Sequence, residues 1–173
     1  MKKFILVNSI LIFLINFPLH FLYERCPNFL TSLFVPVNES IFEHMKMIFT
    51  SYFLAFLFSS LWHKENWKTY LFSFLVTSLF CITLYLALFL PIYFLFGENM
   101  VFTILWLFLS IVLSNFINYH LSTLPTKKYQ TFLSFGILLL FLFLSYTWTY
   151  HPPKWEFFKD PTNASYGILK DKK

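Results

Sequence analysis

The stretch PVNESIFEHMKMIFTSYFLAFLFSSLW, residues 36–62, decides the fold class of this chain. After a polar opening it becomes an apolar run that is long enough to cross the roughly 30 Å hydrocarbon core of a bilayer, for which an α-helix needs about 20 residues. The whole chain has this character, because 58% of its 173 residues are apolar, 24% are aromatic and only 12% are charged. That composition excludes an ordinary soluble domain and predicts an integral membrane protein.

Other apolar runs of similar length lie on either side of this stretch. Lipid offers the backbone no hydrogen-bond partners, so each run that crosses a bilayer must be helical. We therefore expect an all-α, polytopic transmembrane helix bundle of about five spans, formed by residues 1–150, followed by an interfacial tail, residues 151–173. The spans are predicted near residues 4–23, 41–62, 69–90, 101–119 and 129–149.

The placement of lysine predicts the orientation of these spans, because short loops rich in Lys and Arg face the cytoplasm. The short loops 24–40 and 91–100 contain a single basic residue, Arg25. The opposite helix ends carry six, namely Lys2, Lys3, Lys64, Lys68, Lys127 and Lys128. We therefore expect the N-terminus in the cytoplasm and the C-terminal tail outside, although the tail's own lysines oppose this orientation.

The amino-acid composition indicates the kind of organism that makes this protein. Lys greatly outnumbers Arg, Phe and Ile abound, and Gly and Ala are rare, a bias typical of AT-rich coding genomes. We therefore expect a multi-pass protein of a bacterial cytoplasmic (plasma) membrane, with the lipid bilayer as its partner. The net charge of +5 follows from the topology and the basic tail, and it gives no reason to expect a nucleic-acid partner.

Several patterns that mark known activities are missing from the sequence. No GxxxxGK[ST], GxGxxG, HExxH or GxSxG motif occurs. No Asp, Glu, Lys or Arg lies near the middle of a predicted span, which argues against a pump or an ion-coupled carrier. Polar residues at i, i+4 spacing do follow three of the spans, and we expect these faces to look inward. They include Asn8, Asn16, Ser73, Thr77, Ser110, Ser114 and Asn118.

The polar opening, residues 36–47, has a structural interpretation. Asn38 or Ser40 can cap the second span, and Glu43 stands three residues after Ser40, where it would complete a capping box. Carboxylates in a first helical turn also suit the helix dipole. Lys46, at i+3 from Glu43, can pair with its carboxylate.

The same opening also has a chemical interpretation. Glu39 and Glu43 share a helix face and repel each other, and a divalent cation such as zinc would relieve both carboxylates. The candidate metal ligands are Glu39, Glu43 and His44, with His20 and His151 brought in by neighbouring segments. Capping with ion pairing and metal binding both stay open at this stage.

The C-terminal tail begins with Pro152 and Pro153, which force an extended entry. Asp160 and Pro161 then open a turn. We expect the tail to lie across the outer mouth of the bundle. It would act there either as a lid that delivers His151 and Asp160 to the polar cluster or as a simple interfacial segment.

The motif N-E-S-x-x-E-H-x-K at residues 38–46 and the ending HPP…FFKDPTNASYGI at residues 151–168 together resemble the paired signature of a family of small bacterial multi-spanning membrane proteins, classed only as a domain of unknown function. The resemblance covers essentially the whole chain and implies its architecture, but no reaction. It implies importance for Asn38, Glu39, Glu43, His44, Lys46, Asp160, Pro161, Tyr166 and Gly167.

Two functions follow from these residues. The first is a metal-assisted membrane hydrolase that acts on a lipid or envelope substrate at the outer leaflet, with Glu39, Glu43 and His44 as candidate catalytic residues. The second is a non-enzymatic carrier of a lipid or small molecule, or a partner-binding membrane subunit, in which Glu43 and Lys46 form a structural pair.

Overall fold

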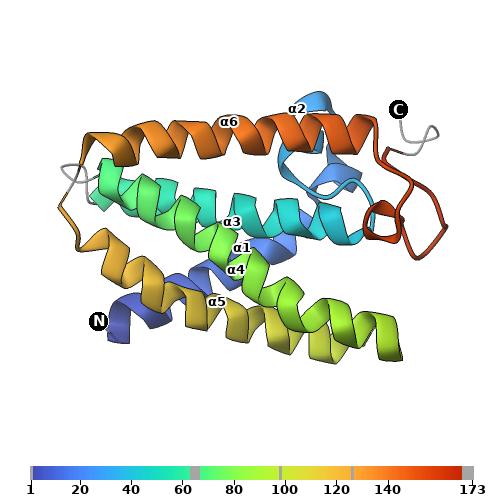
Figure 1. Cartoon of the computed structure of the whole chain (residues 1–173), viewed down its shortest axis with the longest axis horizontal. Coiled ribbons are helices and arrows are strands. Elements are labelled where there is room, and N and C mark those ends of the chain that lie inside the picture. Colours follow the sequence, from blue (N-terminus) through green and yellow to red (C-terminus); the bar gives the residue numbers. More distant parts are fainter. Residues whose placement is uncertain (1, 63–66, 98, 126, 169–173) are drawn as a thin grey trace.

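The computed structural model describes residues 2–62, 67–97, 99–125 and 127–168. These residues form an all-α bundle with no strand among them, apart from an isolated antiparallel bridge between Lys159 and Tyr166. Figure 1 shows the helices and the tail.

Five helices are long and apolar enough to cross a membrane, so the prediction of a helical membrane protein with about five spans is confirmed. They are α1 (Lys2–Arg25), α3 (Ile41–Trp62), α4 (Trp67–Phe96), α5 (Met100–Ser122) and α6 (Lys128–Tyr150). The third predicted span, residues 69–90, ends six residues too early, because α4 continues through Pro91 to Phe96. Proline is tolerated inside membrane helices, where neighbouring groups satisfy the freed backbone.

A short helix that the sequence did not predict, α2 (Phe29–Phe34), lies between the first two spans. Asn28 caps it, because its Oδ1 accepts a hydrogen bond from the Thr31 N–H at 3.0 Å and its own N–H donates to Thr31 Oγ1 at 3.1 Å. This reciprocal capping box stabilises a helix within residues 24–40, which we expected to form a short loop.

The helix α3 lies at the centre of the bundle. It packs against α1 and α4, while α4 also packs against α5 and α6. In Figure 1, α6 runs along one side and α5 along the other, α3 lies between them, and α1 and α4 cross the bundle obliquely. In an apolar stretch of 18 residues within α3, 72% of the residues are buried, whereas the share in the corresponding stretch of α6 is 11%. The polar opening of α3 is therefore held among other helices, whereas α6 presents most of its surface outward.

The polar faces that we expected to look inward are buried, which confirms that prediction. Their side chains join the helices by hydrogen bonds from Asn115 to Ser9 at 3.1 Å, from Asn16 to Ser51 at 3.2 Å and from Ser73 to Asn118 at 2.6 Å, together with one between Tyr52 and Ser114. Each such bond in a membrane contributes about 0.6 kcal/mol and up to roughly 2 kcal/mol. These bonds connect α1, α3, α4 and α5. They matter here because the sequence has only three glycines, the residues that allow close helix packing in membranes.

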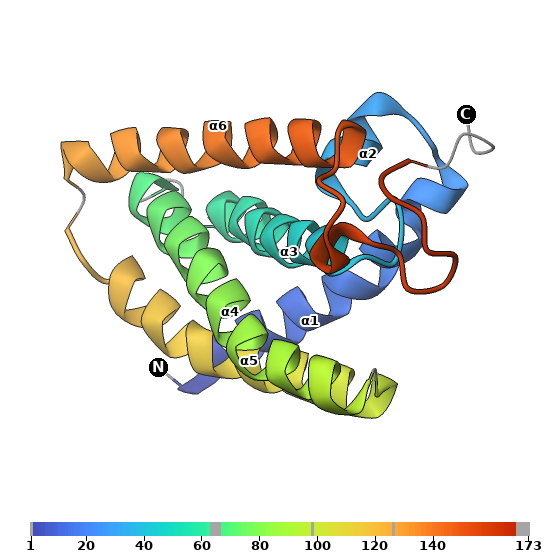
Figure 2. The same cartoon turned by 45° about the vertical axis from the view of Figure 1, so that its right-hand side comes forward.

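The two halves of the sequence signature lie together at one end of the bundle. We call this the tail end: it is where α1 and α6 finish, α3 begins, and residues 26–40 meet the tail, residues 151–168 (Figures 1 and 2). The tail contains a short 3₁₀ helix, η2 (Glu156–Phe158), which packs against α3. The side of the membrane that the tail end faces stays a prediction of the lysine pattern.

Candidate functional site

The polar opening enters α3 through a bent, non-helical segment, residues 36–40, which we call the entry segment. Ser40 stands just before Ile41, and its Oγ lies 3.5 Å from the Glu43 N–H, a long contact for a helix cap. The Ser40 N–H donates to Asn38 Oδ1 at 2.9 Å, so Glu43 does not complete the capping box as the sequence suggested. The Glu43 carboxylate instead accepts the Val37 N–H at 3.1 Å.

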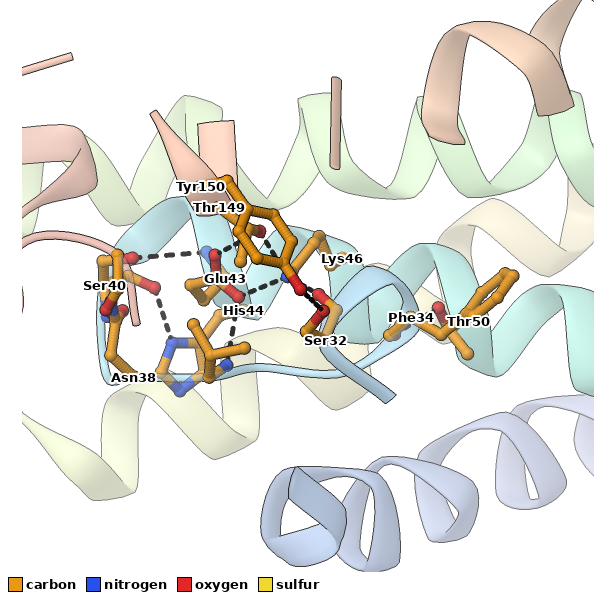
Figure 3. Close-up of polar contacts among 12 residues, drawn as sticks. Ser32, Phe34, Asn38, Ser40, Glu43, His44, Lys46, Thr50, Thr149 and Tyr150 are labelled. Atoms are coloured by element: carbon orange, nitrogen blue, oxygen red, sulfur yellow. Dashed lines mark hydrogen bonds and ion pairs between the residues drawn. The ribbon is translucent and has the colours of Figure 1, made fainter. Parts of the chain in front are cut away.

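Glu43 and Lys46 form a buried ion pair one turn inside α3 (Figure 3). Their residues are 1% and 2% exposed, respectively. Lys46 Nζ also donates to the Ser32 carbonyl oxygen and to Thr149 Oγ1, each at 2.8 Å. The Thr149 hydroxyl in turn donates to Glu43 Oε1 at 2.9 Å. Every donor of Lys46 and both oxygens of Glu43 therefore have partners.

This ion pair is a structural joint between three helices, because Ser32 belongs to α2 and Thr149 to α6. Removing one partner of a buried ion pair leaves an uncompensated charge and costs about 3–5 kcal/mol. Glu43 was a candidate ligand and catalytic residue. The structure places it in this enclosed pair and apart from the three residues that lie close enough together to share a metal ion.

Those three residues are His20, Glu39 and His44, which we call the metal triad. His20 comes from the last turns of α1, Glu39 from the entry segment and His44 from the first turns of α3. Glu39 Oε2 lies 3.4 Å from His20 Nε2 and 3.5 Å from His44 Nε2. One ligand atom from each of the three side chains lies within 4.8 Å of the other two.

These separations suit a tetrahedral zinc ion. Two atoms bound at about 2.0–2.1 Å to such an ion lie roughly 3.4 Å apart, so both His–Glu separations already have the required length. Two histidines and one glutamate are also the ligand set of several catalytic zinc sites, which leave the fourth position to water or substrate.

The second ring nitrogen of His44 supports a ligand role for the first. His44 Nδ1 lies 3.0 Å from the Ser40 carbonyl oxygen, which can only accept a hydrogen bond, so Nδ1 carries the hydrogen. The neutral ring then has its lone pair on Nε2, the atom that faces Glu39. Metal-binding histidines are commonly oriented by such a carbonyl partner.

A small pocket of about 30 Å³ opens beside the metal triad. A space of this size holds one or two water molecules. Its wall is formed by Glu39, Ile41, His44, Met45, Tyr85, Phe89, Tyr93, Thr103 and Pro161. Water can therefore occupy the open side of the site, with Pro161 of the tail as part of the wall.

Asp160 contacts the metal triad through the backbone N–H of Glu39. Its carboxylate is buried and accepts from Thr162 N–H at 2.8 Å, Thr162 Oγ1 at 2.6 Å and Asn163 Nδ2 at 3.3 Å, which closes the turn of the tail. It also receives the Glu39 N–H at 3.4 Å. His151, the other residue that we considered for delivery by the tail, is exposed at the end of α6 and lies outside the triad.

Gly167 locks the tail against the end of α6. Its φ is +66°, and a Cβ atom at this position would lie 2.6 Å from the Thr149 carbonyl oxygen and 3.1 Å from Pro152. Only glycine fits this approach without strain. Tyr166, just before it, forms the bridge with Lys159.

A protein-family model described as a family of unknown function, DUF6512, matches residues 1–168. The chain belongs to this family. The DUF6512 match confirms the family resemblance inferred from the sequence and supplies no activity. No curated protein and no solved structure matches the chain. The function of this DUF6512 protein must therefore be argued from its site.

Sequence reasoning missed Thr149 in this DUF6512 protein. This residue serves both Glu43 and Lys46 from 103 or more positions away, and nothing in its local sequence distinguishes it from the other hydroxyls of α6. The pocket residue Tyr93 was missed for the same reason, since it lies in an apolar run. Tyr85 continues the polar face of the third span that we expected to look inward, but nothing in the sequence connects it with this pocket. His20 carried a weak signal, a histidine in the last turn of a membrane span.

Proposed function

We propose that this protein is a metal-dependent membrane hydrolase that uses a zinc ion held by His20, Glu39 and His44. The observation that carries the proposal is the convergence of these three side chains, from two helices and the segment between them, within ligand distance of one another. The water-sized pocket beside Glu39 and His44 supports an open coordination position.

A zinc ion at this position would lower the pKa of a bound water to about 7 and polarise a carbonyl or phosphoryl oxygen. The metal would thus supply the nucleophile of a hydrolysis and stabilise the charge that develops on the substrate oxygen, and the proton lost by the water would be available to the leaving oxygen. Glu39 and the two histidines supply the ligands. Glu43 and Lys46 are positioning residues, since they fix the start of α3 on which His44 lies.

The membrane location suggests the substrate class. Under the positive-inside orientation, the tail end of the bundle faces outward, at the level of the outer leaflet. The substrate would then be an ester or phosphoester of a lipid or another envelope component.

Metal content and hydrolysis together test this function. The protein would be purified in detergent, stripped with a chelator, incubated with zinc, and measured by elemental mass spectrometry. We expect about one zinc per chain in the wild type and in His151→Ala, and almost none in a double variant with His20→Ala and His44→Ala. His151 is the matched control, because it is a histidine at the same end of the bundle but outside the metal triad.

The catalytic part has its own readout. Fluorogenic phospholipid esters presented in detergent micelles should be hydrolysed by the zinc-loaded wild type, and chelation should abolish the rate. A protein that stays folded and monodisperse but retains no zinc refutes the metal site. Zinc binding without hydrolysis of any ester or phosphoester tested refutes the hydrolase while leaving the metal site in place.

The second candidate is a non-enzymatic membrane protein that binds a lipid, a small molecule or a partner subunit. The observation that favours it is that all polar groups of the Glu43 and Lys46 side chains are engaged in contacts that join α3 to α2 and α6. These two charged residues of the polar opening therefore have a structural role. A zinc-free wild type would move the proposal to this function.

A further inference from the structure

A second and larger hollow lies between α3, α4 and α6. Its volume is about 160 Å³, and its lining includes Phe49, Leu79, Ile82, Ile137, Phe141 and Ser145. An engineered apolar cavity of about 150 Å³ in another protein is large enough to bind benzene. The groove, as we call this hollow, is therefore more than a packing defect.

Ser145 is the polar residue that α6 contributes to the groove. It is 1% exposed, and its hydroxyl has no hydrogen-bond partner among the described residues. Leaving a buried hydroxyl unsatisfied costs about 1–3 kcal/mol. Ser134 on the same helix avoids this cost by donating to the Gln130 carbonyl oxygen at 2.8 Å. Thr77, Ser110 and Ser165 also have buried hydroxyls without a partner among the described residues, but of these four hydroxyls only that of Ser145 belongs to a residue that lines the groove.

The groove is elongated and polar at one end. The α6 residues that line it run from Ile137 to Ser145, which corresponds to about 12 Å along the helix. Lys46 lies on the groove toward the tail end, like Ser145, whereas Ile137 lies farther from that end. An occupant would thus have a long apolar body and a hydrogen-bonding group at one end.

The location of the groove indicates where its occupant comes from. Figure 2 shows α4 and α6 close together at one end and diverging toward the other. Few residues of α6 are buried, as expected for a helix that faces lipid. A molecule could therefore enter sideways from the bilayer.

Lys46 limits the chemistry of the polar group. Its three hydrogens are taken by Glu43, Ser32 and Thr149, and its charge is neutralised by Glu43. A free carboxylate would find no unpaired positive charge there, whereas a neutral ester carbonyl needs only a hydroxyl donor. The enclosed Ser145 hydroxyl, which has no partner among the described residues, would be that donor after turning toward the groove.

We propose that the groove binds one acyl chain of a bilayer glycerolipid, whose ester carbonyl oxygen accepts a hydrogen bond from the Ser145 hydroxyl. This site does not depend on the metal triad. Met45 lines both the groove and the pocket beside His44, so the bound chain would lie next to the metal site without sharing its residues.

Thermal unfolding in detergent tests the proposal. The delipidated protein would be melted with and without added dioleoyl phosphatidylcholine, and again with oleic acid in its place. Wild type should show a saturable rise of a few degrees in Tm with the phospholipid and a smaller rise with oleic acid. Native mass spectrometry should find one phospholipid retained per chain.

Three variants make the test specific. Ile137→Trp fills the groove and should abolish the phospholipid-induced rise in Tm, whereas Leu139→Trp, on a position of α6 that is 67% exposed, should keep it. Ser145→Ala should melt at or above the wild-type temperature without lipid, because an unsatisfied hydroxyl has been removed, and yet bind the phospholipid several-fold more weakly.

Each result decides the proposal. It is overturned if Ile137→Trp keeps the full phospholipid effect, or if Ser145→Ala binds as tightly as the wild type. If Ile137→Trp does not fold, Ser145→Ala alone decides. A larger effect of oleic acid than of phospholipid overturns the glycerolipid assignment. Loss of zinc from the metal triad changes none of these readouts, so the two proposals fail separately.

Discussion

Asn38 donates a hydrogen bond through its Nδ2 to the Gly167 carbonyl oxygen at 2.9 Å, across 129 positions of the chain. The same asparagine uses its Oδ1 to hold the Ser40 N–H at the entrance of α3. One side chain therefore fixes both the start of the central helix and the end of the tail. The two halves of the sequence signature are joined by direct contact.

Replacing Gly167 with alanine should loosen this joint. The new Cβ would meet the Thr149 carbonyl oxygen at 2.6 Å, and the backbone has a positive φ, so we expect a loss of about 1–3 kcal/mol in the free energy of unfolding. Thermal melting in detergent measures it.

Gly97→Ala is the control for Gly167→Ala. Gly97 has a similar φ of +79°, but nothing lies within 4 Å of its added Cβ, so only backbone strain remains. Equal losses in the two variants would show that the contact with Thr149 contributes nothing.

Replacing one partner of the buried ion pair should lower the free energy of unfolding more than replacing both partners. Lys46→Met alone leaves the Glu43 carboxylate buried without a counter-charge, and we expect a loss of about 3–5 kcal/mol. Adding Glu43→Gln should restore part of the stability, because the remaining amide is neutral. The melting temperatures of the two single variants and the double variant give the coupling energy.

Two results would contradict the proposed ion pair. If Lys46→Met melts like the wild type, or if Glu43→Gln gives no rescue in its background, Glu43 and Lys46 do not act as a pair.

Two natural cysteines report the orientation of the protein. Cys26 is exposed at the tail end, and Cys81 is buried in α4. A membrane-impermeant maleimide should label Cys26 in intact cells, because the lysine pattern places this end outside. Cys26→Ser is the control and should abolish labelling. Labelling of Cys26 only after the membrane is permeabilised would reverse the orientation and move the metal triad to the cytoplasmic side.

Much of the fold could be predicted from the sequence, because each apolar run must become a helix in lipid and polar residues at i, i+4 must turn inward. The helix α2 could not, since its six residues depend on one capping box between Asn28 and Thr31. The end of α4 was not predicted either, because a helix more often ends near a proline, whereas α4 continues through Pro91 to Phe96.

The candidate site was only partly visible in the sequence. Glu39 and His44 could be singled out because they lie in one polar motif, and His20 and His151 could be named as histidines of neighbouring segments. The geometry brings His20, but not His151, to the other two. The division of labour between the two glutamates could not be predicted. It depends on Thr149 of α6, whose hydroxyl accepts a hydrogen bond from the Lys46 ammonium and donates one to Glu43. Glu43 is therefore enclosed, whereas Glu39 lies beside the two histidines.

That division of labour gives the most direct test of the account. Zinc per chain would be measured by elemental mass spectrometry on the folded, monodisperse fractions of Glu39→Gln and Glu43→Gln after identical zinc loading. We predict that Glu39→Gln loses its zinc, because a carboxylate ligand has been removed, whereas Glu43→Gln is less stable but still holds about one zinc per chain. A Glu39→Gln protein that keeps its zinc, or a folded Glu43→Gln protein that has lost it, would contradict the assignment of the metal site to His20, Glu39 and His44.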